Sequence, residues 1–265
     1  MGLELPLRLR IQFAFTRRLT VLLRRLGLRE PVIAARHAVL RERRRLFERC
    51  GSARYSRPAL HRMDRELDRI IDRDGGFFVE AGGFDGFTQS NTYFLERFRR
   101  WRGILVEPMP ELAAEARRNR PSAAVFQCAL VAAEHDRDWV EMEFGDLMTN
   151  VSGTHETGWT SAGLVLGWRD HRVERVPARR LSELLDEAGG PEVHLLSLDV
   201  EGYEAAALRG LDLERHAPAW ILIEMHDPVA GRSEIAPILG DRYAEHSQLS
   251  PVDVLYRRLG PPGGR

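Results

Sequence analysis

Apolar residues recur with two different patterns of spacing along the chain, and the first pattern gives way to the second near residue 75. Before it, residues 36–48 and 59–71 carry apolar side chains at three- and four-residue spacing, which predicts helices. After it, short apolar runs alternate with helical stretches, and this alternation is typical of a parallel sheet covered by helices on both faces. The pattern predicts an α/β fold preceded by a helical extension.

The spacing of apolar residues predicts individual strands, helices and loops. Residues 145–175 have no clear period and are rich in Gly, Ser, Thr, His and Trp, so we expect a long functional loop there. We predict two parts, an N-terminal extension (residues 1–73) and a main domain (residues 74–260). Strands are expected at 77–80, 103–107, 123–130, 139–144, 193–199, 219–224 and 252–257, and helices at 88–100, 111–119, 181–187 and 204–209.

Composition narrows the class of protein. The 265 residues allow one large domain with an appendage. All 39 basic residues are Arg, which excludes a lysine Schiff base. Two cysteines are too few for a disulfide framework or a cysteine zinc site. The sequence contains neither an apolar run of about 18 residues nor a secretory signal, so we expect a cytoplasmic protein.

Charge is unevenly distributed, although the whole chain is neutral. Residues 1–73 contain 19 Arg and 8 acidic residues, so the remainder is net acidic. The basic extension could form a lid over the site, a homo-oligomer interface or a contact with an anionic membrane surface. We expect no nucleic-acid partner, because the acidic main domain would repel phosphates.

The first predicted strand runs into the glycine-rich segment EAGGFDG, residues 80–86. Glycines allow a tight turn and close approach of a ligand. A dinucleotide fingerprint needs glycine at position 81, where the chain has Ala81. The acid at the strand end, Glu80, suits an ammonium group. An ordinary strand–helix turn is the alternative interpretation.

The second predicted strand ends at Glu107, followed by Pro108. An acid at this position can accept hydrogen bonds from two ribose hydroxyls, as in nucleotide-binding βαβ units. A solvent-facing acid would be the alternative if Glu107 stood alone. The succession of Glu80 and Glu107 at consecutive strand ends favours a nucleoside-containing ligand.

Acidic residues and a histidine follow two later strands that we expect to be neighbours. Asp199 and Glu201 follow one strand, and Glu224 and His226 follow the other. Carboxylates with an imidazole suit a divalent ion or acid–base catalysis. The alternatives are helix capping by Glu201 or Glu204 and a surface position for His226.

Taken together, VEAGGFDG, ILVEP, LLSLDVEGYE and ILIEMH resemble the FkbM family of S-adenosylmethionine-dependent methyltransferases over about residues 76–258. The segment from Asp199 to Glu204 matches the family's D-x-E-G-x-E pattern. The family's first motif has Asp where this chain has Glu80, and Ala-Asn where it has Gly83-Phe84. The resemblance implies a seven-stranded, Rossmann-like class I methyltransferase fold. It also implies a cofactor site formed by Glu80, Gly82, Gly83, Phe84, Asp85, Gly86, Glu107, Pro108 and Ala129.

These observations lead to one main functional hypothesis. We expect an O-methyltransferase that acts on a hydroxyl of a sugar, glycolipid or polyketide-type product. His226 would be the general base, aided by Asp199, Glu201 and Glu224, and Asp199 with Glu224 could hold Mg²⁺. Should His226 have no role, His155 and His171 are the next candidates. A nicotinamide-dependent oxidoreductase and a non-catalytic nucleotide-binding scaffold are the alternatives.

Overall fold

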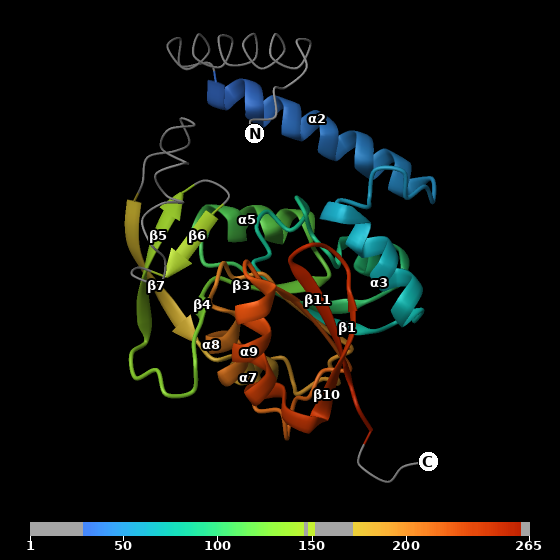
Figure 1. Cartoon of the computed structure of the whole chain (residues 1–265). Helices are drawn as coiled ribbons and strands as arrows, with labels where there is room; N and C mark the ends of the chain where they lie inside the picture. Colours follow the sequence, from blue (N-terminus) through green and yellow to red (C-terminus); the bar gives the residue numbers. More distant parts are fainter. Residues whose placement is uncertain (1–28, 146–147, 152–171, 261–265) are drawn as a thin grey trace, which may run out of the picture. The chain divides into compact units, whose positions relative to one another are not determined.

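The computed structural model describes residues 29–145, 148–151 and 172–260. The chain divides into two units, Met1–Tyr55 and Ser56–Arg265, and each is described by itself. The first unit contains α2 (Arg29–Arg49), the blue helix of Figure 1, which confirms the helix predicted at 36–48. Near its end Phe47 and Tyr55 meet edge to face. Within the described ranges, no helix is long and apolar enough to cross a membrane.

The second unit contains a seven-stranded sheet of order β10-β11-β9-β8-β1-β2-β3. Neighbouring strands are parallel, except that β11 runs antiparallel to β9 and to β10. The predicted mostly parallel, Rossmann-like sheet is therefore confirmed. Strand order reverses at β1 and β8, where such sheets bind ligands. The strands are β1 (Phe77–Ala81), β2 (Arg102–Val106), β3 (Ala123–Phe126), β8 (Leu195–Leu198), β9 (Trp220–Glu224), β10 (Tyr243–Gln248) and β11 (Asp253–Arg258).

Side chains of β1 alternate between the two faces of the sheet. Val79 and Ala81 belong to the main apolar cluster, which also includes side chains of α7 (Leu181–Glu187), α8 (Glu204–Arg209) and α9 (Pro228–Leu239). Phe78 faces the other way, where the Arg120 guanidinium lies 5.0 Å from its ring centre. Both faces are thus covered by other elements, as Figure 1 shows for the helices beside the sheet.

The helices agree only partly with the prediction. Helices α7 and α8 have the predicted bounds, and α5 (Pro110–Asn119) begins one residue early, with Pro110 in its first turn. The helix predicted at 88–100 is wrong in its first part, because α4 covers only Tyr93–Phe98. Helix α9 was not predicted. Asp227 caps α9 by accepting hydrogen bonds from the amides of Val229 and Ala230.

A smaller sheet, of order β4-β7-β5-β6, follows the third strand. The single strand predicted at 123–130 is divided into β3 and the short β4 (Ala129–Leu130). The extra strand predicted at 139–144 is confirmed as β5 (Trp139–Gly145). The expectation of an irregular loop at 145–175 is wrong at both ends, where β6 (Met148–Val151) and β7 (Arg172–Arg179) pair with β5. His155 and His171 lie outside the described residues.

Residues 56–73 belong to the second unit, so the division lies before the change in composition at residue 74. Helix α3 (Met63–Ile71) buries Leu67 completely and follows the short 3₁₀ helix η1 (Leu60–Arg62). The Arg57 guanidinium donates to Asp68 at 2.6 Å and lies 3.3 Å from the ring centre of Phe94 in α4. Ion pairing and apolar burial both attach this segment to the sheet-containing unit.

Candidate active site

A pocket opens where the parallel strands of the main sheet end. Its lining comes from the ends of β1, β2 and β8 and from the segments that follow them, together with β4 and Met142 of β5. The sequence predicted that its acidic residues lie at this edge of the sheet. The lining residues are Glu80, Ala81, Gly82, Phe84, Thr88, Gln89, Ser90, Asn91, Val106, Glu107, Pro108, Cys128, Ala129, Leu130, Met142, Ser197, Asp199, Val200, Glu201 and Tyr203.

The turn after β1 requires glycine at two positions. Gly82 has a φ of +80°, and a Cβ there would lie 1.9 Å from the carbonyl oxygen of Asp199. Gly86 has a φ of +77°, and its Cβ would lie 2.9 Å from the Cα of Ala116. A larger residue at either position would separate β1 from β8 or from α5. These two glycines therefore allow close packing of the elements that surround the pocket.

Backbone amides of this turn already have partners within the protein. Those of Gly82 and Gly83 donate to the carbonyl of Val106, and that of Gly86 donates to Gly83. The amides of Phe87 and Thr88 donate to the Asp85 carboxylate, at 2.8 and 2.6 Å. A pyrophosphate-binding turn presents amides to its ligand. Because these amides are occupied, the nicotinamide alternative loses its main support.

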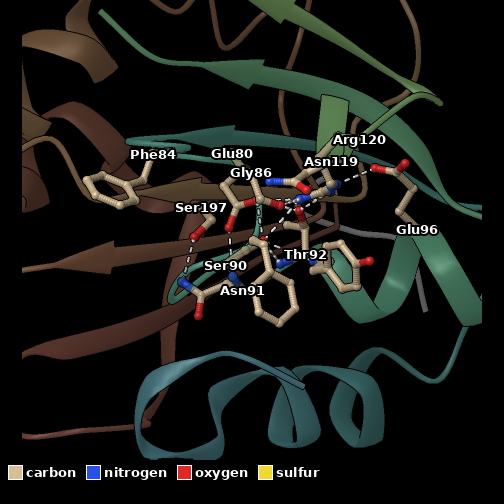
Figure 2. Close-up of polar contacts among 12 residues, drawn as sticks. Glu80, Phe84, Gly86, Ser90, Asn91, Thr92, Glu96, Asn119, Arg120 and Ser197 are labelled. Carbon is tan, nitrogen blue, oxygen red and sulfur yellow. Dashed lines mark hydrogen bonds and ion pairs between the residues drawn. The ribbon is translucent and has the colours of Figure 1, made fainter. Parts of the chain in front are cut away.

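Glu80 lies at the centre of a buried polar network beneath the turn (Figure 2). Its carboxylate accepts from the Ser90 hydroxyl at 2.8 Å, the Asn91 amide at 2.7 Å and the Thr92 hydroxyl at 2.6 Å. The Arg120 guanidinium lies 3.3 Å from the same carboxylate and 2.5 Å from that of Glu96. Arg120 is fully buried, so one buried cation faces two buried anions. The network shapes the pocket wall and leaves a net negative charge behind it.

Glu107, at the end of β2, is also held by the backbone. Its two carboxylate oxygens each accept one hydrogen bond at 2.9 Å, from the amides of Phe84 and Met109. A carboxylate oxygen has two acceptor sites, so each can accept one more donor. Burial raises the pKa of Glu107 to about 7, and the two amides partly oppose that rise. Glu107 can therefore accept ribose hydroxyls, as predicted from the sequence.

Asp199, Glu201, Glu224 and His226 gather at the end of β8 and β9. The Nε2 of His226 lies 3.3 Å from a carboxylate oxygen of Glu201. Ligand atoms of Glu201, Glu224 and His226 lie within 4.8 Å of one another. Burial, and then the neighbouring Glu224, raises the pKa of Asp199 well above its ordinary value. Hydrogen bonding to Glu201 raises the pKa of His226.

Helix capping was the alternative interpretation for the acids after β8, and it is wrong for Glu204, because α8 has no side-chain cap hydrogen bond. One carboxylate oxygen of Glu204 accepts from the amides of Val200 and Gly202, each at 3.0 Å. These two hydrogen bonds close the turn before α8, in which Glu201 has a φ of +55°. Glu204 therefore holds the turn, while Asp199 and Glu201 line the pocket.

Comparison with protein-family models gives one match. Residues 80–246 match the methyltransferase FkbM domain, which covers more than half of the chain. The chain belongs to the FkbM methyltransferase family. The resemblance noted from the sequence is thereby confirmed, and the protein is an S-adenosylmethionine-dependent methyltransferase.

Two solved structures are also similar to the chain. The TehB-like SAM-dependent methyltransferase of Corynebacterium glutamicum has 12% identity and a TM-score of 0.39, with 86% of this chain and 100% of that chain covered. A mutant of MtNAS has 12% identity and a TM-score of 0.37, with 74% of this chain and 58% of that chain covered. The comparison with curated proteins gives no match.

The pocket of this FkbM methyltransferase suits the charge of its cofactor. S-adenosylmethionine carries a sulfonium and an ammonium group, and its ribose supplies hydroxyl donors. Carboxylates of Glu80, Glu107, Asp199 and Glu201 line the pocket, and none of the described lining residues is Arg, Lys or His. A cationic ligand with hydroxyl donors fits this lining better than an anionic dinucleotide does.

The structure divides the predicted site residues into three sets. Gly83, Asp85 and Gly86 shape the turn without lining the pocket, and Glu224 and His226 lie in the cluster beside it. The roles assigned to individual residues stay predictions. Those that line the pocket are Glu80, Gly82, Phe84, Glu107, Pro108, Ala129, Asp199 and Glu201.

Sequence reasoning missed the polar segment that follows the glycine turn. Ser90, Asn91 and Ser197 all line the pocket, and Arg120 supports it from the end of α5. A signal was present, since the consecutive polar residues Ser90, Asn91 and Thr92 come directly before an apolar helix. Nothing in the local sequence, however, indicates that Arg120 reaches the same network.

Proposed function

We propose that this methyltransferase transfers its methyl group to a hydroxyl oxygen of a sugar, glycolipid or polyketide-type acceptor. The observation that supports O-methylation is the pairing of His226 with Glu201, 3.3 Å apart beside a pocket lined by Asp199 and Glu201. A sugar hydroxyl is a weak nucleophile that gains from a positioned base. A histidine held by a carboxylate next to the pocket supplies such a base.

Residues of this chain perform two tasks in the proposed reaction. S-adenosylmethionine supplies, when bound, a methyl group attached to a positively charged sulfur. Asp199 and Glu201 orient the acceptor hydroxyl, and alignment of reactants is worth roughly 7–11 kcal/mol in well-ordered systems. His226 accepts the hydroxyl proton at Nδ1, because its Nε2 faces Glu201, which stabilises the imidazolium that forms.

Charge also supports the acceptor class. Four carboxylates line the pocket, and they would repel an anionic acceptor that enters it. Uncharged polyols donate hydroxyl hydrogens to carboxylates, so they match the lining. We infer a neutral, hydroxyl-rich acceptor, which includes sugars and hydroxylated polyketides.

A divalent ion is a second arrangement for the same cluster. Asp199 and Glu224 were the predicted Mg²⁺ ligands, whereas the geometry brings together Glu201, Glu224 and His226. The two carboxylates suit Mg²⁺ or Mn²⁺, whereas the imidazole is more typical of Zn²⁺ or Fe²⁺. Bound there, the ion would lower the pKa of the acceptor hydroxyl and fix its position.

One experiment separates these arrangements. Methyl transfer from labelled S-adenosylmethionine is measured with a panel of glycosides and hydroxylated polyketides, before and after treatment with a chelator. Activity that survives the chelator supports the histidine base, and activity that returns only with Mg²⁺ or Mn²⁺ supports the metal. Transfer to amines or thiols instead of hydroxyls would contradict the proposal. Cofactor binding without turnover on any acceptor would favour the scaffold alternative.

A further inference from the structure

Among the described residues that line the pocket, Asn91 alone has a fully buried side-chain atom without a hydrogen-bond partner, namely Oδ1. The residue is 7% exposed. A buried acceptor without a donor is costly. A ligand that enters the pocket and offers a donor would remove this cost.

Two hydrogen bonds hold Asn91 in place (Figure 2). Its backbone amide donates to Glu80 at 2.7 Å, and its Nδ2 donates to the Ser197 hydroxyl at 3.1 Å. Glu80 and Ser197 are partners in the register of β1 and β8. Asn91 therefore spans the two strands at which the sheet order reverses. It lies on the other side of β1 from Glu107, whose strand β2 pairs with β1 from the opposite edge.

The surroundings of Asn91 need a donor from the ligand rather than an acceptor. The amides of Thr92 and Tyr93 donate to the Ser90 hydroxyl, and that of Ser90 donates to Phe87. A ligand carboxylate would therefore find these amides occupied. The unpaired atom is an oxygen, and the carboxylate of Glu80 lies next to it in the network.

We propose that Asn91 Oδ1 accepts a hydrogen bond from the ammonium group of the methionine part of S-adenosylmethionine. With the ribose held by Glu107 at β2, this places the amino-acid end of the cofactor over β1 and β8. Ser197 acts as a positioning residue that turns the Asn91 amide so that its oxygen is available. This inference rests on the methyltransferase function and is independent of which acceptor is methylated.

The test measures ligand binding by calorimetry, with three ligands and without turnover. These are S-adenosylhomocysteine, its decarboxylated analogue, which keeps the amine, and its desamino analogue, which keeps the carboxylate. Asn91→Ala should weaken the two amine-containing ligands by about 10–100-fold, the effect of losing a hydrogen bond to a charged group. Binding of the desamino analogue should stay unchanged, which also shows that the variant is folded.

Asn91→Asp distinguishes the two ways in which the amide could face the ligand. A carboxylate at this position still accepts from an ammonium group, so S-adenosylhomocysteine should bind at least as tightly as to the wild type. If Nδ2 instead served the cofactor carboxylate, the Asp variant would lose S-adenosylhomocysteine but keep the decarboxylated analogue. That result would overturn the proposal.

Asn119 provides a matched control, because it is also a buried asparagine beside the turn. Its Nδ2 donates to the carbonyl of Asp85 at 2.8 Å, and it does not line the pocket. Asn119→Ala should affect all three ligands equally. Equal loss of all three in Asn91→Ala would show a structural role only. Failure of the wild type to bind S-adenosylhomocysteine would instead contradict the methyltransferase function itself.

Discussion

The two sides of the pocket are built differently. On the side of β1 and β2, polar groups are paired within the protein: Glu80 accepts from four partners, and Glu107 from two backbone amides. On the side of β8 and β9, like charges face each other. There the pKa of Asp199 is raised by burial and by Glu224, and that of His226 is raised by Glu201.

The difference indicates that the side of β1 and β2 fixes the shape of the pocket, and that the side of β8 and β9 carries its reactive groups. A densely hydrogen-bonded network is rigid, because several of its side chains lose more than one hydrogen bond if they move. A cluster of interacting acids and an imidazole instead changes its protonation easily, which suits proton transfer. We expect substitutions on the first side to affect stability and cofactor affinity, and substitutions on the second side to affect turnover.

The largest expected effect concerns Arg120. The substitution Arg120→Met leaves Glu80 and Glu96 buried without their shared cation. The free energy of unfolding should fall by about 3–5 kcal/mol, measured by urea denaturation. The control is Arg118→Met, which breaks the exposed pair with Glu115 and should cost less than about 1 kcal/mol. Similar small losses in both variants would contradict a structural role for the network.

The second prediction concerns turnover. His226→Ala removes the proposed base without replacing a residue that lines the pocket, so kcat should fall by at least about 10²-fold. Affinity for S-adenosylhomocysteine should stay near that of the wild type. His246→Ala is the control, because His246 is exposed in β10 and contacts Ser247. Near-normal turnover of the His226 variant would remove this residue from the mechanism.

The third prediction concerns the cofactor side. Glu107→Ala should weaken binding of S-adenosylhomocysteine by about 1–3 kcal/mol, because the ribose hydroxyls lose their acceptor. Calorimetry measures this change. Unchanged affinity would show that the ribose lies elsewhere.

The raised pKa of Glu107 adds a pH dependence to this side. Ionised Glu107 is the better acceptor, so cofactor affinity of the wild type should increase as pH rises through about 7. Stability should change in the opposite direction. The unfolded chain releases this proton near pH 4.5, so the contribution of Glu107 to stability falls between pH 4.5 and about 7. Both dependences should be weaker in Glu107→Ala, and their persistence there would assign them to another group.

The smallest effect is expected from removal of the first unit. A chain that begins at Ser56 should bind S-adenosylhomocysteine like the full chain. A chain that begins at Asp72 should be less stable, because it lacks the buried Leu67 and the Arg57–Asp68 pair. Flotation with anionic vesicles at low salt tests the proposed membrane contact. Binding by the full chain but not by the Ser56 chain would support it, and binding by neither would favour a lid or an oligomer interface.

The sequence predicted those helices and strands whose apolar pattern lies within a few consecutive residues. The apolar runs that became β1, β2, β8 and β9 were predicted within about two residues, and the acids that follow them do lie at one edge of the sheet. Helix α9 was missed because Pro237 and Gly231 interrupt its pattern. Strand β10 was missed because its residues are mostly polar and exposed.

Tertiary structure alone decided the remaining features of the site. Arg120 reaches Glu80 from the end of α5, Ser197 reaches Asn91 from β8, and α3 belongs to the sheet-containing unit although it precedes the change in apolar pattern near residue 75. These contacts join residues that are distant in the sequence. Periodicity shows which face of an element is buried, but not which distant charge will meet it there. Acids at successive strand ends could be read from the sequence because parallel strands must end at the same edge, whereas the partners of those acids depend on how helices pack across the sheet.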